Sequence, residues 1–530
     1  MLRLGTWQLE AGPPRDRRVL IGAACQAATR GDLSLAERLM RAGSGSGHAL
    51  AQVLIWQGRH EEAAAALPGA APDGIDGEWA VTHAWSRYWG TGEYAEAIQE
   101  LAGAGPGAAV AGARAWLLLY SGQCGQALAA VAPIVTGGNV GTGWPFGLAA
   151  AVHAHALAGQ GDTAIAVADR GLPLAARDGT AVWDEVMLSW PKFNALLLVG
   201  RTWEAEALAE DRYAAAAGLG LDDNMIAIWT VQRARAAAAR GGLRAARDAL
   251  REAVTLLADR DYYRFSGYVL AELAGVAAQT GDAAAARDWM SRSDERRTDA
   301  NRMFEPSVQL RRAWTVAAGG ELASAARHAR YAADLARAAG QYAIEAEALY
   351  DVARFAHAAA VVPRLSALAD ALDGALAPVL ADAGAALATM DGYRLDRAAA
   401  AFDDLGLPVH AAELAGAAAR AHRARGRACA AALSLQRVSA LAQDLPDART
   451  PLLKINWAER RQGLTHRERE VALLAASGLS SRTIAAKLQL SVRTVSNHLA
   501  RVYAKFGVAS RAELTALLTP LATAIPGGRE

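Results

Sequence analysis

The 530-residue chain has only three cysteines, and they lie far apart at Cys25, Cys124 and Cys429. An odd number of widely separated cysteines supports neither a disulfide framework nor a metal-binding cluster. We therefore predict no metal site, and we expect the protein to work in the reducing cytoplasm.

Lysine is equally scarce, because the sequence contains only Lys192, Lys454, Lys487 and Lys505, and none of them follows a glycine. A nucleotide-binding P-loop requires a glycine-rich turn that ends in Gly-Lys-Ser/Thr, so that backbone amides and the lysine hold the phosphates. The nearest match, Gly43-Ser-Gly-Ser-Gly-His48, lacks the lysine. The sequence therefore predicts neither ATP nor any other cofactor.

Long apolar runs are missing as well. The first ten residues contain no apolar stretch of signal-peptide length. The run nearest to membrane length, 366–390, is interrupted by Asp370, Asp373 and Asp382. We expect no membrane-spanning segment and no membrane partner.

Arrangements typical of catalysis are also lacking. His153 and His155 are two residues apart, which places them on different faces of a helix. No nucleophile with a neighbouring base, no paired carboxylates and no alternating strand and helix pattern of a receiver domain are apparent. The protein is predicted not to be an enzyme.

Alanine dominates what is present. Hydrophobic residues make up 53% of the chain but aromatic residues only 6%, and 17 prolines leave room for many uninterrupted helices. Alanine has the highest helix propensity and allows helices to approach closely. The composition predicts an all-α protein.

A glycine followed five positions later by an alanine recurs along the first 430 residues. From Gly122 onward the glycines are separated by 39, 39, 41, 40 and 39 residues, and before it by 27, 34 and 30. A repeat of this length indicates a solenoid of helix pairs. The instances run Gly31/Ala36, Gly58/Ala63, Gly92/Ala97, Gly122/Ala127, Gly161/Ala166, Gly200/Ala205, Gly241/Ala246, Gly281/Ala286 and Gly320/Ala325.

The chemistry of this signature explains why it would mark a helix pair. Glycine can adopt the left-handed conformation that ends the first helix. The aspartates that follow it in three repeats, Asp32, Asp162 and Asp282, are good N-caps for the second helix. The signature is missing near residue 359, where we expect the regularity to decay.

These units resemble tetratricopeptide-like repeats with a period longer than the standard one of about 34 residues. The pattern over 31–442 is similar to the superhelical repeat region of large LuxR-family regulators of the MalT type, without their N-terminal ATPase. A solenoid of this kind has a concave groove suited to a small-molecule or protein effector. Tryptophans gathered in the first third could line the groove or pack between helices: Trp56, Trp79, Trp85, Trp89, Trp116 and Trp144.

The charge is distributed unevenly along the chain. Residues 451–530 hold 12 Lys+Arg against 5 Asp+Glu, whereas the rest of the chain holds 43 against 49. A basic tail on a mildly acidic body is typical of a polyanion-binding module attached to another domain. We predict a repeat domain over 1–442, a linker with two prolines over 443–462, and a DNA-binding domain over 463–530.

Three short helical patterns follow the linker. Thr465 and Glu468 form a predicted capping box for a helix over 467–477, and Ser480 or Ser481 caps a second helix over 482–488. Ser491 caps a third, in which Val495, Leu499, Val502 and Phe506 are spaced as one buried stripe. Its opposite face presents Arg493, Ser496, Asn497, Ala500 and Arg501.

The spacing is typical of a helix-turn-helix DNA-binding domain. The matching stretches are Leu464-Thr-His-Arg-Glu-Arg-Glu-Val471, Gly478-Leu-Ser, Ile484 to Leu488, Thr494-Val-Ser-Asn-His498, Lys505-Phe-Gly-Val508 and Arg511. They resemble the LuxR-type domain along its full length. The resemblance implies a fourth helix over 511–518 that forms a dimer contact. The lysine frequent in that family after Thr-Val is Ser496 here, so the predicted contact face is less basic.

We predict that Asn497 reads adenine and that Arg493 holds guanine or phosphate, while other residues position the phosphate backbone. His498 has two open interpretations, phosphate contact or local packing, and Thr465 and Thr494 could serve mainly in capping. The full predicted DNA-binding set is Thr465, Arg467, Ser480, Ser481, Arg482, Arg493, Thr494, Ser496, Asn497, His498, Arg501 and Lys505.

The sequence thus predicts a tetratricopeptide-like solenoid followed by a four-helix LuxR-type domain, acting as a bacterial transcription regulator. Double-stranded DNA is the expected partner, bound by a homodimer, with RNA polymerase as a further candidate. The alternative is a protein-interaction scaffold that carries a vestigial helix-turn-helix.

Overall fold

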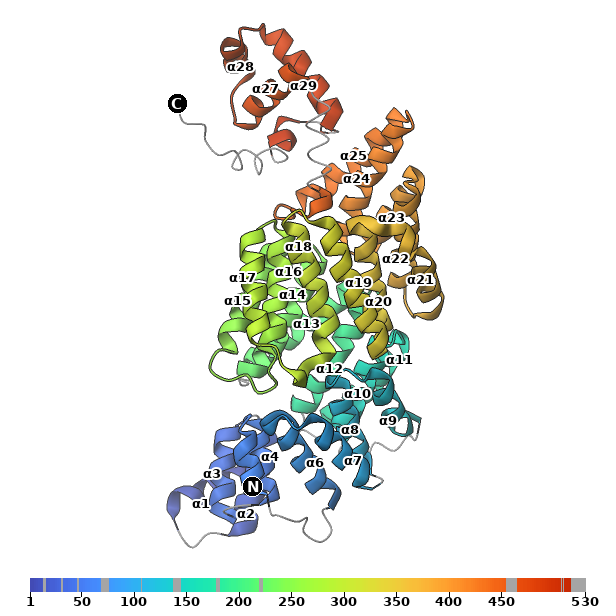
Figure 1. Ribbon diagram of the computed structural model, residues 1–530. Coiled ribbons are helices and arrows are strands. Elements are labelled where there is room, and N and C mark those ends of the chain that lie inside the picture. The colour runs from blue at the N-terminus through green and yellow to red at the C-terminus, as the bar shows by residue number, and fades with distance from the viewer. Residues whose placement is uncertain are drawn as a thin grey trace.

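The computed structural model describes residues 1–12, 16–29, 32–44, 47–67, 76–105, 107–136, 144–177, 182–218, 223–453, 465–506, 508 and 510–515. The regular structure of these residues is entirely helical (Figure 1), which confirms the all-α prediction. No described helix combines the length and apolarity needed to cross a bilayer.

The first part of the chain forms short helices joined by tight turns. They are α1 (Leu2–Ala11), α2 (Arg17–Thr29), α3 (Leu33–Ser44), α4 (His48–Trp56), α5 (His60–Ala66), α6 (Asp76–Ser86), the π-helix η1 (Arg87–Thr91), α7 (Tyr94–Gly103), α8 (Ala108–Tyr120), α9 (Cys124–Thr136), α10 (Trp144–Leu157) and α11 (Gly161–Arg177).

The longer helices that follow form the middle and the end of the solenoid. They are α12 (Val182–Leu198), α13 (Thr202–Gly218), α14 (Asp223–Ala239), α15 (Leu243–Leu256), α16 (Ser266–Gln279), α17 (Ala283–Glu295), the 3₁₀ helix η2 (Asp299–Phe304), α18 (Glu305–Ala318), α19 (Leu322–Ala339), α20 (Tyr342–Val352), the π-helix η3 (Ala353–His357), α21 (Ala358–Ala371), α22 (Leu376–Thr389), α23 (Gly392–Asp404), α24 (Pro408–Ala424) and α25 (Ala428–Gln443).

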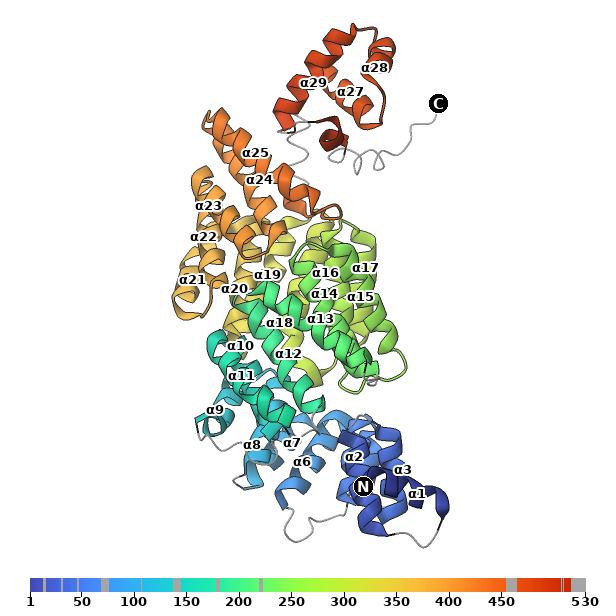
Figure 2. The same ribbon diagram turned by 180° about the vertical axis from the view of Figure 1, so that it is seen from behind.

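The pairs form two layers because their two helices differ in pattern. Helix α15 has one buried stripe, Leu243, Ala246, Leu250 and Ala253, and exposes its charged face. Helix α16 is apolar nearly all round and buried from Gly267 to Ala278. Helices of the second kind contact one another along the chain (α10 with α12, α12 with α14, α16 with α18), and they form the inner layer of the superhelix (Figures 1 and 2).

The turns between paired helices confirm most of the repeat signature. Positive φ angles occur at Gly58, Gly92, Gly122, Gly200, Gly241, Gly281 and Gly320, and the alanine five positions later is buried in each repeat. Gly31 lies outside the described residues. Asp282 caps its helix by accepting from the Ala285 amide at 3.0 Å, and Asp32 accepts from Leu35 at 2.9 Å.

One repeat was predicted in the wrong register. Gly159, not Gly161, takes the left-handed conformation (φ 85°), and the buried alanine is Ala164 instead of Ala166. Gly161 begins α11, so Asp162 does not cap that helix; its amide donates to Asp373 Oδ2 at 3.2 Å. Two glycines two residues apart both fit the local pattern, and only the packing against neighbouring helices selects one.

The expected loss of regularity near residue 359 is also present. The pair α19/α20 turns at Gly340 (φ 76°), and α20 then runs through η3 into α21 without a glycine turn. Of the tryptophans considered above, Trp85, Trp89 and Trp116 are buried and Trp56 and Trp79 are half-buried, whereas the Trp144 side chain lies outside the described residues.

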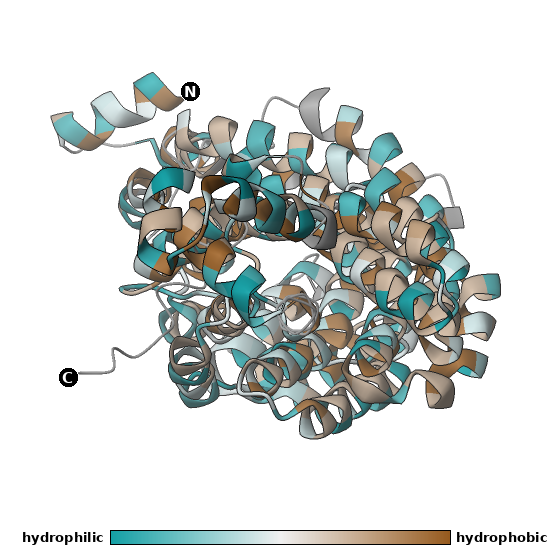
Figure 3. Cartoon of the chain, turned by 90° about the horizontal axis from the view of Figure 1, so that it is seen from above, coloured by the Kyte–Doolittle hydropathy of each residue, from teal (hydrophilic) through white to brown (hydrophobic). Residues whose placement is uncertain are grey.

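Contacts between residues about 200 positions apart close the superhelix on itself. Tyr88 Oη donates to Ala300 O at 3.0 Å, and Thr202 Oγ1 donates to Leu405 O at 2.6 Å. The amide of Asp373 donates to Gly159 O at 2.8 Å. Because about five repeats of 40 residues separate these partners, each turn of the solenoid rests on the previous one. Seen from above, the helices lie around a common axis (Figure 3).

The C-terminal module follows α25 and has a core of its own. It contains α27 (His466–Ala476), α28 (Ser481–Leu488), α29 (Val492–Phe506) and a short helix over 511–515. The predicted fourth helix therefore begins at its expected residue, and 516–518 lie outside the described residues. The buried side chains are Val471, Ala472, Ala475, Ile484, Ala485, Val495, Leu499, Val502, Val508 and Leu514.

Candidate nucleic-acid interface

Local capping positions the first helix of the module. Thr465 Oγ1 accepts from the Glu468 amide at 3.3 Å, and Glu468 Oε2 accepts from the Thr465 amide at 2.8 Å, which confirms the predicted capping box. Both side chains are thereby held within the helix start. Arg467 is exposed, and its Nη1 donates to Glu470 Oε2 of the same helix at 2.9 Å.

The second helix begins at Ser481 and is capped by Ser480, whose Oγ accepts from the Thr483 amide at 3.1 Å. Arg482 lies exposed in its first turn and forms no ion pair with any described residue. The helix ends at Gln489, which adopts φ 54° and ψ 45°. This left-handed residue makes the turn into the third helix, and the sequence analysis did not identify it.

The third helix, α29, starts after the cap Ser491, whose Oγ accepts from the Thr494 amide at 3.0 Å and lies 2.7 Å from Thr494 Oγ1. Val495, Leu499 and Val502 are buried against α27 and α28, as predicted. The side chain of Phe506, the fourth member of the predicted stripe, lies outside the described residues.

The opposite face of α29 is open to solvent. Arg493, Ser496, Asn497 and Arg501 are exposed, and neither arginine is paired with an acidic group among the described residues. Ser496 Oγ donates to Val492 O within the helix at 3.0 Å. A serine hydroxyl used in this way adds no positive charge, so the guanidinium groups of Arg493 and Arg501 carry the charge of this face.

Val492 was missed by the sequence reasoning. It is 47% exposed at the first position of α29, beside Arg493. An exposed valine at this position offers an apolar surface of the kind that contacts a thymine methyl group. The signal was available, because the residue directly follows the predicted cap Ser491.

Two predicted residues lie differently from the rest. His498 is half-buried, and its Nδ1 has no hydrogen-bond partner among the described residues, so the ring packs against the module while remaining partly accessible. The side chain of Lys505 lies outside the described residues. The structure therefore places Arg482, Arg493, Ser496, Asn497 and Arg501 on exposed surface of two adjoining helices, α28 and α29.

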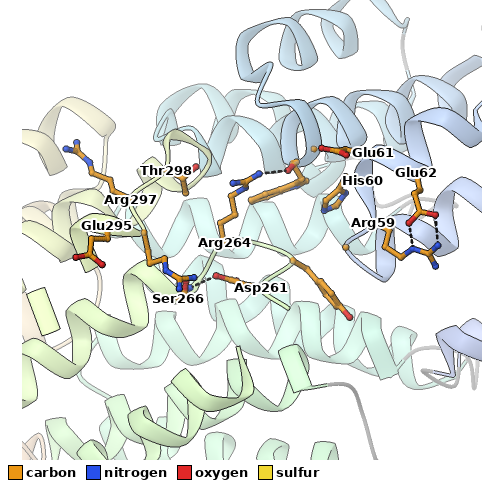
Figure 4. Close-up of a pocket in the computed structure, with 15 residues that line it drawn as sticks. Arg59, His60, Glu61, Glu62, Asp261, Arg264, Ser266, Glu295, Arg297 and Thr298 are labelled. Carbon is orange, nitrogen blue, oxygen red and sulfur yellow. Dashed lines mark hydrogen bonds and ion pairs between the residues drawn. The ribbon is translucent and has the colours of Figure 1, made fainter. Parts of the chain in front are cut away.

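The body contains a separate polar cleft of about 550 Å³ between the α4–α5 turn and the segment before α16 (Figure 4). Its lining includes four arginines and four acidic residues. Arg59 Nε donates to Glu62 Oε1 at 2.6 Å, and Asp261 accepts from the amides of Phe265 and Ser266. Burial lowers the pKa of His60 to about 4. This balanced cleft favours no ligand of a particular charge.

Comparison with known proteins identifies the module. Residues 462–518 match the family model described as "Bacterial regulatory proteins, luxR family". The C-terminal segment is therefore a LuxR-family helix-turn-helix domain.

The similar curated proteins match this chain over a short segment. A putative HTH-type transcriptional regulator of Mycobacterium bovis is 53% identical over 51 residues, which are 10% of this chain and 6% of that protein. The transcriptional activator ExaE of Pseudomonas putida is 50% identical over 58 residues, 11% of this chain and 27% of ExaE. UhpA of Escherichia coli is 46% identical over 66 residues, 12% of this chain and 34% of UhpA.

Alignments with solved structures extend over a larger share of the chain. A Rap protein complexed with competence and sporulation factor aligns over 69% of this chain and 90% of its own, with 12% identity and a TM-score of 0.39. The Cut9-Hcn1 hetero-tetramer aligns over 82% and 92%, with 12% identity and a TM-score of 0.35.

Proposed function

We propose that this protein is a cytoplasmic transcription regulator whose C-terminal module reads promoter DNA under the control of the helical-repeat body. The observation that carries the proposal is the exposed face of α29 within a LuxR-family domain. A recognition helix enters the major groove with its N-terminal part, and Arg493, Ser496 and Asn497 occupy that part here.

The side chains of this face have distinct roles in the proposal. Asn497 pairs bidentately with adenine, and Arg493 pairs with guanine or with a phosphate. Ser480, Ser481 and Arg482, at the start of α28, hold phosphates with backbone amides and a positive charge. Arg501, Lys505 and His498 extend the phosphate contacts along α29. Arg467 reaches DNA only after leaving Glu470, while Thr465 and Thr494 support the helix starts.

The module acts as a homodimer on DNA in this proposal. Helix-turn-helix domains of this size read one half-site each, and two half-sites provide the usual specificity. The helix that starts at Arg511 supplies the contact between two modules. An effector bound to the solenoid frees or pairs the modules. RNA polymerase is the further partner, and it responds to the modules bound at the promoter.

Selection of genomic fragments by the full-length protein, followed by fluorescence anisotropy on the enriched sequence, tests the proposal. Asn497→Ala and Arg493→Ala are compared with Arg327→Ala, which removes an exposed charge from α19 in the body. The proposal is supported if Asn497→Ala and Arg493→Ala lose sequence-specific binding while Arg327→Ala retains it. Equal binding by all three would favour the scaffold interpretation, in which the helix-turn-helix is vestigial.

A further inference from the structure

The inner helices of the middle and last repeats surround a cavity of about 180 Å³. Its lining residues come mainly from α12, α14, α16, α18, α20, η3, α22, α23 and α24. Pockets for drug-sized ligands measure roughly 300 Å³ or more. The volume here suits a smaller organic molecule.

Most charged groups around the cavity are paired with one another. Arg311 Nε lies 3.1 Å from both carboxylate oxygens of Glu272. Arg354 donates to Asp351 Oδ1 at 2.7 Å and to both oxygens of Glu413 at 2.8 and 2.9 Å. These pairs satisfy three of the four carboxyl groups of this network, of which Glu272 and Asp351 line the cavity and Glu413 does not.

Glu347 is the fourth, and it forms neither a hydrogen bond nor an ion pair with any described residue. It projects from α20 into the cavity lining. The third arginine, Arg235, also lacks an acidic partner among the described residues, but its Nη1 donates to Asn194 and Gln232. The cavity lining thus holds three guanidinium and three carboxyl groups, and Glu413 adds a fourth carboxyl group behind Arg354. Within this network Glu347 is the carboxyl group without an ion pair among the described residues.

Two further polar atoms beside Glu347 are unsatisfied. Tyr350 Oη and His410 Nδ1 are enclosed and have no hydrogen-bond partner among the described residues. Tyr350 is 1% exposed, and its ring lies 5.5 Å from Phe402 and 5.9 Å from His410, centroid to centroid. Buried polar groups are nearly always satisfied in native proteins, so these two atoms are positions at which a ligand in the cavity can form hydrogen bonds.

The same cavity wall holds the segment that leads to the DNA-binding module. Thr450 is fully buried, and its Oγ1 donates to Glu413 Oε1 at 2.5 Å. The amide of Arg449 donates at 2.7 Å to the carbonyl of Gln279, a residue that lines the cavity. Residues 444–453, part of the predicted linker, are therefore packed on the cavity wall immediately before residue 454.

We propose that this cavity is the effector site and that it binds a small organic cation with an aromatic or aliphatic body. The ammonium group pairs with Glu347, the carboxyl group of the described lining that has no ion pair, while the body packs against Tyr350 and Phe402. Ligand binding changes the packing of residues 444–453 through the hydrogen bonds that this segment makes with Glu413 and Gln279. This last step rests on the proposed function, whereas the ligand site itself does not.

Titration calorimetry on the full-length protein at pH 7.5 tests the site with three probes of similar shape: 2-phenylethylamine, neutral 2-phenylethanol and anionic phenylacetate. The amine is expected to bind most tightly. Glu347→Gln keeps the shape of the side chain and removes its charge, and it should weaken amine binding about tenfold or more, since a charge-assisted hydrogen bond contributes roughly 1.5–3 kcal/mol. Asp334→Asn, which removes an exposed carboxylate from α19, should have no effect.

Preference for phenylacetate, equal binding of the amine by wild type and Glu347→Gln, or no heat with millimolar amine would each overturn the proposal. DNA affinity is measured in the absence of the three probes, so that the proposed regulator function and the proposed cavity site are tested independently. A protein that binds DNA but not the amine refutes the cavity site alone, and one that binds the amine but not DNA refutes the regulator function alone.

Discussion

The hydroxyl group of Thr450 donates to Oε1 of Glu413 at 2.5 Å, inside the body and only four residues before the segment that connects to the DNA-binding module. Glu413 simultaneously receives two hydrogen bonds from Arg354 on the cavity wall. One buried carboxylate thus joins the interior of the solenoid to the route toward the DNA-binding module.

Removal of this hydroxyl group should loosen the packing of residues 444–453 on the body. In Thr450→Val, Glu413 stays paired with Arg354, so we expect a loss of about 1 kcal/mol in the free energy of unfolding. Leu453 loses a bond too, because its amide donates to Thr450 Oγ1 at 3.3 Å. Hydrogen exchange should accelerate over 444–453. Thr255→Val, whose hydroxyl bonds only within its own exposed helix, is the control and should leave this exchange unchanged.

Base reading should depend on two residues of α29. We expect Asn497→Ala and Arg493→Ala each to weaken binding to the selected sequence by about 1–3 kcal/mol and to relax the preference at one base position. Fluorescence anisotropy on a set of single-base variants of the site measures both effects. A uniform loss across all sequences would assign the residue to a phosphate.

The salt dependence of binding should reveal the phosphate contact of Arg482. Each neutralised phosphate contributes roughly −0.9 to the slope of log K against log salt on duplex DNA. Arg482→Ala should therefore make the slope less steep by about 1 while sequence preference stays the same. Arg327→Ala in the body should preserve the slope, and a preserved slope in Arg482→Ala would remove this residue from the interface.

Contact between successive turns of the superhelix should make the stability of the protein sensitive to substitution of Gly374. Its φ is 85°, and an added Cβ would lie 2.7 Å from the backbone of Val199, one turn earlier. Gly320 has a similar φ of 92°, but nothing lies within 4 Å of an added Cβ. Gly320→Ala should cost about 1–2 kcal/mol for the left-handed backbone. Gly374→Ala should cost about 1–3 kcal/mol more because the two turns must separate. Thermal unfolding compares the two, and equal losses would show that the contact is not tight.

The pH dependence of stability should contain a contribution from Glu347. Burial raises its pKa to about 7, while Arg311 and Arg235 lower it and Asp351 and Glu272 raise it further. Between the unfolded pKa, about 4.5, and the folded pKa, the native state binds a proton that the unfolded state has released. Stability from this group is therefore fully present below pH 4.5 and is lost as pH rises to 7, by up to about 3 kcal/mol.

The difference between wild type and Glu347→Gln isolates this contribution. Burial lowers the pKa of His60 to about 4, and a buried neutral histidine changes stability in the opposite direction, which the subtraction removes. Chemical denaturation at pH 5 and pH 8 should show that the glutamine variant gains stability relative to wild type at the higher pH. An identical difference at both values would show that Glu347 titrates normally.

Local chemistry explains why much of the module could be predicted from the sequence. The Thr465–Glu468 capping box, the cap Ser491 and the buried stripe of Val495, Leu499 and Val502 each depend on residues within one or two helical turns. The exposed Val492 and the left-handed Gln489 depend on the same neighbourhood, but neither an apolar residue at a helix start nor a glutamine in a left-handed turn is a usual sequence signal.

The cavity could not be predicted, although its residues leave a trace. Arg235, Glu272, Arg311 and Glu347 stand in largely apolar helices, roughly one repeat apart from one another. Charged residues that recur once per repeat in this way could have indicated that their side chains lie together in the inner layer of the solenoid. Which of them pair, and that Glu347 does not, depends on side chains from different helices meeting across the axis of the superhelix.

The sequence by itself determined the helices, their caps, the pairing of neighbouring helices and the presence of a LuxR-family helix-turn-helix module, because each rests on short-range patterns. Only the tertiary structure decided that Gly159 and not Gly161 turns the chain, that residues about 200 positions apart close the solenoid, and that Thr450 meets Glu413. The rotation between successive pairs is the sum of many small packing differences, and no local pattern encodes that sum. The cavity and its connection to the DNA-binding module exist because these rotations bring each turn back onto the one before it.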